Sequence, residues 1–224
     1  MSESFREDQT APRAESLVGL TDQRRLDEAL VHGKAHPPKQ AILMLLESLS
    51  QVEPESDERL AVIHALAINL VEAGFPEMAR RVVDANERLY RRRRAGKLYA
   101  LRRVWLEGKI AFALGEWGAA EAKLNTARLA FGHAGRGYEA ALSGLDLAQV
   151  YARQQRHRET VWLVEDLVRT LRTRRVAREA IAALDLLKSA CEKGQPPDIL
   201  LAHIETIAVT IDELQRLRPR RARR

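Results

Sequence analysis

The sequence has a single cysteine, few aromatic residues and no long uninterrupted apolar run. Cys191 has no second cysteine for an intramolecular disulfide, and a structural zinc–thiolate site needs several thiolates. No stretch approaches the roughly 18 consecutive apolar residues of a membrane span. The opening MSESFREDQT is polar and acidic and lacks the apolar core of a signal peptide. We therefore expect a cytoplasmic protein in a reducing compartment, with no membrane association.

Motifs that carry catalysis or hold cofactors are also missing. The sequence contains no HExxH, GxSxG, Walker-type or dinucleotide-binding glycine pattern. His32 and His36 are four residues apart, but Gly33 and Pro37 disfavour a continuous helix that would bring them together. Cys191 lies on an apolar helix face and is interpreted as a small core residue. We predict that the protein is not an enzyme and that it has no catalytic residues, metal or cofactor.

The positive charge is concentrated in one place. The formal net charge is +6, and residues 216–224 contain six arginines and no acidic residue, so the rest of the chain is formally neutral. A second basic stretch, RLYRRRRAGK, covers residues 88–97. Cations near a helix C-terminus complement the helix dipole, but these side chains are also candidates for contacts with nucleic-acid phosphates or an acidic partner. The candidates are Arg91, Arg92, Arg93, Arg94, Arg216, Arg218, Arg220 and Arg221.

What the sequence does have is helical periodicity along most of its length. Apolar residues recur at spacings of three and four, and no segment alternates with a two-residue period, which predicts an all-α fold. Pro76 and Pro197 suit the first turn of a helix, and Pro37 and Pro38 are both candidates to open another. The expected helices cover residues 21–32, 38–51, 58–73, 76–93, 98–114, 117–132, 138–154, 157–173, 176–193 and 198–215.

A period near 40 residues organises these helices. Turns are expected at Gly33, Gly74, Gly115, Gln155 and Gly194, at intervals of 41, 41, 40 and 39 residues. A regular spacing of this length is typical of stacked helical repeats. We expect a tail at residues 1–17 that is disordered, a repeat domain at 18–215 and an arginine-rich tail at 216–224.

Small residues mark where the helices of one repeat would approach each other. In WLEGKIAFALGEWGAAEAKL, residues 105–124, Gly108 and Ala111 lie on the first helix. Ala120 and Ala127 lie on the second helix, with Leu124 between them, and Trp105, Phe112 and Trp117 would fill the wider spaces. Close approach of two backbones offsets the unfavourable helix propensity of glycine, which is about 1 kcal/mol relative to alanine.

This pattern resembles the tetratricopeptide repeat (TPR). The units on either side match through Leu66, Ala67, Leu70, Ala79 and Val83, and through Leu147, Ala148, Tyr151, Thr160, Val164 and Leu167. The chain departs from the family at Glu107, where leucine is usual, at Trp105, one residue later than the usual tryptophan, and in its period, which exceeds the usual 34 or so. The resemblance implies a right-handed α-solenoid of about five TPR-like antiparallel helix pairs.

The function that the resemblance implies is protein binding. Repeats of this kind occur in the C-terminal regions of larger bacterial regulatory proteins, where the first helix of each pair lines a concave groove. We expect a non-enzymatic scaffold or adaptor, of bacterial regulatory type, that binds a partner peptide or helix there. The groove positions map to His64, Ile68, Glu72, Arg102, Lys109, Phe112, Gln149, Arg153, Lys188 and Glu192.

Two other functions stay open. The arginine tail favours a nucleic-acid-associated regulatory subunit, and the repeats also suit a sensor that holds a short peptide. The identity of the partner and the oligomeric state do not follow from the sequence.

Overall fold

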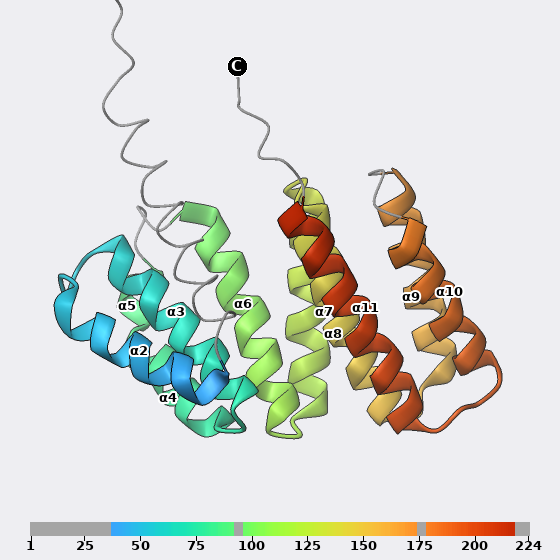
Figure 1. Cartoon of the computed structure of the whole chain (residues 1–224), viewed down its shortest axis with the longest axis horizontal. Coiled ribbons are helices and arrows are strands. Elements are labelled where there is room, and N and C mark those ends of the chain that lie inside the picture. Colours follow the sequence, from blue (N-terminus) through green and yellow to red (C-terminus); the bar gives the residue numbers. More distant parts are fainter. Residues whose placement is uncertain (1–36, 92–95, 174–177, 218–224) are drawn as a thin grey trace, which may run out of the picture.

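The computed structural model describes residues 37–91, 96–173 and 178–217, and within these ranges the chain forms helices and no strands. The predicted all-α class is confirmed. The helices are α2 Pro38–Gln51, α3 Asp57–Glu72, α4 Pro76–Ala85, α5 Glu87–Tyr90, α6 Gly96–Ala113, α7 Trp117–His133, α8 Gly137–Arg153, α9 His157–Thr173, α10 Arg178–Glu192 and α11 Pro197–Leu217. Figure 1 shows α2 to α10 succeeding one another across the molecule, with α11 turned back in front of α8.

The helices begin and end where local chemistry favours it. Pro38, Pro76 and Pro197 each open a helix, as predicted, because the missing amide hydrogen has no intrahelical acceptor there. Ser56 caps α3, and its side-chain oxygen accepts a hydrogen bond of 3.0 Å from the backbone N–H of Arg59. Most of the observed boundaries agree with the predicted ones within two residues. The predicted helix 21–32 lies outside the described residues.

One predicted helix was wrong in its extent. Residues 76–93 do not form a single helix, because the chain breaks at Asn86 between α4 and α5. The side-chain amide of Asn86 donates to the carbonyl of Val82 at 2.8 Å, and its backbone has φ −112° and ψ 18°, outside the helical region. Asparagine competes for backbone hydrogen bonds in this way and so favours helix ends.

The turns share one geometry. Gly74, Gly115, Gly135 and Gly194 have φ between +63° and +84°, and Gln155 has φ +57°. In each turn the N–H of the next residue bonds the carbonyl five positions before it, as from Phe75 to Leu70 at 2.8 Å. This is the Schellman helix end, which needs a left-handed residue. The predicted turns at Gly74, Gly115, Gln155 and Gly194 are confirmed.

Gln155 is the one non-glycine residue with positive φ in the described ranges. A side chain strains the left-handed conformation, so replacing Gln155 with glycine should raise the free energy of unfolding by about 0.5–1 kcal/mol. Chemical denaturation would measure this gain. The neighbouring Gln154 has φ −88°, and there glycine should lower stability. If glycine lowers the free energy of unfolding equally at Gln155 and Gln154, the backbone at Gln155 is not strained.

The α6–α7 contact depends on Gly108. A Cβ atom built on Gly108 would lie 2.8 Å from side-chain atoms of Leu124 and 3.2 Å from its backbone nitrogen. Ala111, Ala120 and Ala127 are also buried. The predicted close approach at these small residues is confirmed. Gly144 marks a second close helix contact, since a Cβ atom built on it would lie 2.6 Å from the side chain of Leu167 on α9.

The core runs between the helix pairs as connected apolar clusters. One cluster joins residues of α2 to α6, and a larger one joins residues of α6 to α11. Trp105 packs edge-on against Phe131, with ring centroids 5.8 Å apart, and Phe112 packs similarly against Trp117 at 5.6 Å. These aromatic rings lie beside the small residues, as the sequence predicts.

The last described helix, α11, packs against two other helices. α11 packs against both α10 and α8, while α10 packs against α9. In Figure 1, α11 crosses in front of α8. Its buried stripe consists of Leu200, Ile204, Ile207 and Ile211. α8 is therefore covered by α7, α9 and α11.

Candidate functional site

The predicted groove residues fall on four helices. α3 packs against α6, and α6 packs against α8, so the first helices of three successive pairs form a continuous row, the α3–α6–α8 row. This row carries eight of the ten predicted positions. Glu72 and Arg153 are exposed; Ile68, Arg102, Lys109, Phe112 and Gln149 are half-buried; His64 is buried.

The two positions on α10 have different neighbours. The ammonium of Lys188 donates to Glu165 on α9 at 2.5 Å and lies 3.8 Å from Glu192 on its own helix. Beside α8 it is α11 that continues the row, and Arg153 lies 3.6 Å from Asp198 at the start of α11. The structure therefore brings together the candidates on α3, α6 and α8, and it places Lys188 on the α9 side.

His64 lies beneath the surface of the row. Its Nδ1 is 3.2 Å from the Tyr90 hydroxyl, and its ring packs edge-on against Tyr90 and Tyr99. Burial, followed by the positive charges of Arg102 and Lys109, lowers the pKa of His64 to about 3. His64 is therefore neutral at pH 7 and acts as a packing residue with a hydrogen-bond partner.

A hydrogen bond that the sequence did not reveal joins α6 to α8. The indole N–H of Trp105 donates to Asp146 Oδ2 at 2.6 Å. Burial raises the pKa of Asp146, while the charge of Lys109 and this hydrogen bond act to lower it. The positive charge of Lys109 on α6 acts to lower the pKa of both His64 on α3 and Asp146 on α8.

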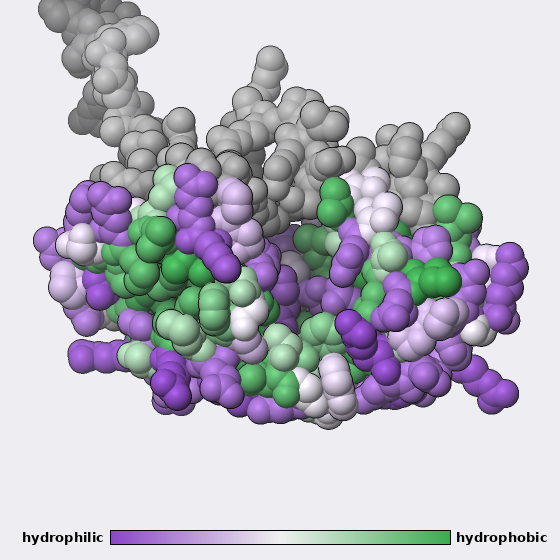
Figure 2. All heavy atoms as spheres, turned by 60° about the horizontal axis from the view of Figure 1, so that its bottom comes forward, coloured by the Kyte–Doolittle hydropathy of each residue, from purple (hydrophilic) through white to green (hydrophobic). Residues whose placement is uncertain are grey.

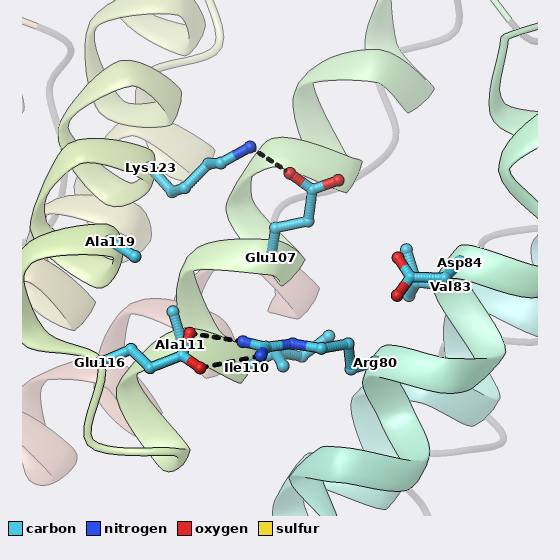
Figure 3. Close-up of a pocket in the computed structure, with 9 residues that line it drawn as sticks. All are labelled: Arg80, Val83, Asp84, Glu107, Ile110, Ala111, Glu116, Ala119 and Lys123. Atoms are coloured by element: carbon cyan, nitrogen blue, oxygen red, sulfur yellow. Dashed lines mark hydrogen bonds and ion pairs between the residues drawn. The ribbon is translucent and has the colours of Figure 1, made fainter.

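A cleft of about 310 Å³ lies on another side of α6, between α4 and α7. Figure 3 shows the Arg80 guanidinium reaching Glu116 with two hydrogen bonds, of 2.8 and 2.5 Å. Lys123 donates to Glu107 at 2.5 Å, and Asp84 lies across the cleft. The other lining residues are Val83, Ile110, Ala111 and Ala119.

Glu107 contributes a carboxylate to the lining of this cleft. Glu107 stands where the TPR pattern has leucine, so the residue itself was visible as a departure from that pattern, but the contacts of its carboxylate were not. Burial acts to raise the pKa of Glu107, but hydrogen bonds from Lys123 and Arg103 outweigh it, and the pKa lies below its usual value. An ionised Glu107 thus links α6 to α7 through Lys123.

A smaller cleft of about 210 Å³ lies between α7, α8 and α9. It also contains an ion pair between neighbouring second helices, since Arg128 of α7 donates to Asp166 of α9 at 2.5 Å. The charges at both clefts therefore pair across neighbouring helices, and an exposed pair of this kind contributes at most about 1 kcal/mol to stability.

The basic candidates are mostly outside the described part of the chain. Arg91 is exposed and pairs with Glu87 at 2.8 Å. Arg92, Arg93, Arg94, Arg218, Arg220 and Arg221 lie outside the described residues, and for Arg216 only the backbone, in α11, is described.

Cys191 is buried, and burial followed by the charge of Glu192 raises the pKa of its thiol to about 11, so the reactive thiolate is scarce at neutral pH. Within the described ranges, three or more His, Cys, Asp or Glu side chains nowhere come together as metal ligands. None of the described helices combines the length and apolar character needed to cross a bilayer.

Comparisons with known proteins add no identification. The chain matches no family model, no curated protein and no solved structure.

Proposed function

We propose that the chain is a non-enzymatic protein-interaction scaffold or adaptor, of bacterial regulatory type. In this proposal its helices form a TPR-like right-handed solenoid, and a partner peptide or helix binds along the α3–α6–α8 row.

The observation that carries the proposal is the α3–α6–α8 row, in which α6 packs against both α3 and α8. Lys109 belongs to the middle helix of this row and is half-buried. Stacked helix pairs build an extended binding surface in this way. The repeated Schellman turns and the Gly108 contact support the TPR-like arrangement.

The row offers chemistry that suits a polypeptide. Glu72 and Arg153 supply exposed charges of both signs, Gln149 supplies amide hydrogen bonding, and Phe112 supplies half-buried apolar surface. Alternating charged, amide and apolar groups match the backbone and side chains of a peptide. In this proposal α11 limits the surface at α8, so a partner contacts α3, α6 and the edge between α8 and α11.

Charge reversal at Lys109 tests the proposal. Affinity capture from a lysate of the source cells, read by mass spectrometry, should recover a partner with the wild-type chain and at least tenfold less of it with Lys109→Glu. Reversing a cation at the centre of an interface introduces repulsion where attraction was present. Circular dichroism would show that the variant keeps its helices.

Arg158→Glu is the matched control, because Arg158 is exposed on α9 and undergoes the same change of charge. It should capture the partner as well as the wild type does. Equal recovery by the wild type and Lys109→Glu would remove the row as the binding surface, and turnover by the isolated chain would remove the scaffold proposal.

A further inference from the structure

α2 exposes an unusual amount of apolar surface. Leu43 is 68% exposed, Leu46 48% and Met44 38%. In Figure 2 green surface gathers at the left, over the part of the molecule where Figure 1 places α2. No other described helix leaves three large apolar side chains this exposed within four residues.

The exposed side chains lie opposite the face that α2 packs on α3. Ala41 and Leu45 are buried, and Ile42 and Leu49 are half-buried in the same cluster. The helix is thus apolar on both sides, which is typical of a helix covered on both sides. Contiguous exposed apolar surface commonly marks a site of protein association.

The outer stripe of α2 is symmetric about the middle of the helix. Lys39, Leu43, Leu46 and Ser50 follow one another at spacings of four, three and four, and α2 runs from 38 to 51. Spacings of this kind form the seam between two packed helices. If two such helices cross antiparallel at their midpoints, Leu43 of each lies against Leu46 of the other.

Charge also favours the antiparallel arrangement. Lys39 is the single basic residue of α2 and lies in its N-terminal half; Glu47 is the single acidic residue and lies in its C-terminal half. Both are exposed. Antiparallel pairing brings Lys39 of one copy to the half of the other that holds Glu47, and it also opposes the two helix dipoles favourably.

From these observations we propose that α2 is a self-association surface, at which a second copy of this chain packs its own α2 antiparallel across a two-fold axis. The same patch serves both copies, as a two-fold interface requires. One helix stripe is smaller than the 800 Å² or so per partner of a standard interface, so the dimer is weak, with a dissociation constant of about 10–100 µM.

Sedimentation equilibrium of the full chain, over concentrations on both sides of that range, tests the proposal. The wild type should move from monomer to dimer, and Leu43→Glu should weaken association about 100-fold, because it buries a charge against leucine. Since position 43 is exposed, the variant should keep the wild-type melting temperature when measured in dilute solution.

A pair of double variants tests the geometry. Leu43→Glu/Leu46→Lys should associate about tenfold more tightly than Leu43→Glu/Leu46→Glu, because antiparallel packing sets each new carboxylate against a new ammonium. The two variants lose the same apolar surface, so lost hydrophobic contact alone predicts no difference.

Three outcomes would overturn the proposal. The first is equal association of the Glu/Lys and Glu/Glu variants. The second is a monomeric wild type together with a lower melting temperature of Leu43→Glu in dilute solution, which would assign the patch to residues 1–36 of the same chain. The third is a monomeric wild type together with an unchanged melting temperature of Leu43→Glu. This outcome would mean that the exposed face of α2 binds a different protein.

Discussion

Replacement of Gly108 by leucine is expected to lower the melting temperature by about 10 °C. The Cβ alone would meet Leu124 at 2.8 Å, and the nearby backbone nitrogen of Leu124 limits how far α7 can give way. Overpacking a closed contact destabilises by about 3 kcal/mol at the upper end of its usual range, and each kcal/mol corresponds to roughly 2–4 °C in a chain of this size. Thermal unfolding followed by circular dichroism measures the shift.

The control for this variant lies on the facing helix. Gly118 of α7 is exposed, and a Cβ there would meet nothing within 4 Å. Gly118→Leu should therefore keep stability within about 1 kcal/mol of the wild type, with a small gain from helix propensity. A wild-type melting curve for Gly108→Leu would show that the two helices do not depend on close approach at this residue.

Acidification is expected to destabilise the protein through His64. Burial first, and then Arg102 and Lys109, lower its pKa in the folded state to about 3, whereas its ordinary value is 6.5. The unfolded chain therefore binds this proton more readily. The contribution of neutral His64 is complete above pH 6.5 or so and is lost as pH falls toward the folded-state pKa, at up to about 1.4 kcal/mol per pH unit.

His64→Gln separates this effect from other titrations. Chemical denaturation at pH 7, 6 and 5 should give the variant a flatter decline in stability than the wild type, because glutamine does not titrate and still offers Tyr90 a hydrogen-bond partner. This pH range lies above the pH at which Glu107 and Glu116 titrate, because their basic partners lower the pKa values of both carboxyl groups.

His203→Gln provides the comparison, since His203 is half-exposed on α11. It should keep the pH dependence of the wild type. If His64→Gln declines as steeply as the wild type between pH 7 and 5, the burial of a neutral His64 does not contribute to acid sensitivity.

The positions of helices and turns were predictable because they depend on local chemistry. Glycine at Gly74, Gly115 and Gly194 supplies the left-handed residue that ends each helix, and the regular spacing identified Gln155 in the same role without a glycine. The small residues Gly108 and Ala120 likewise indicated a close contact between two helices. The helix break at Asn86 was not predicted. It depends on a hydrogen bond from the Asn86 side chain to a backbone carbonyl, and this bond competes only weakly with the hydrogen bonds of a continuing helix.

Contacts between distant segments were not predictable from the pattern. Trp105 and Asp146 are 41 residues apart, and their hydrogen bond depends on how α6 and α8 pack. Both α10 and α11 carry an apolar stripe, so periodicity does not decide which of them covers α8. Glu107 was visible as a departure from the repeat, but its cleft required the positions of α4 and α7.

The placement of α11 also determines how the C-terminal half comes apart. A terminal helix that packs only on its own partner helix can fray independently. Here the stripe of Ile204, Ile207 and Ile211 belongs to the same cluster as Leu145 and Leu147 of α8. The helices α10 and α11 cannot separate from α8 without opening that cluster. The backbone amide hydrogens of α8 through α11 should therefore exchange with solvent as one cooperative unit.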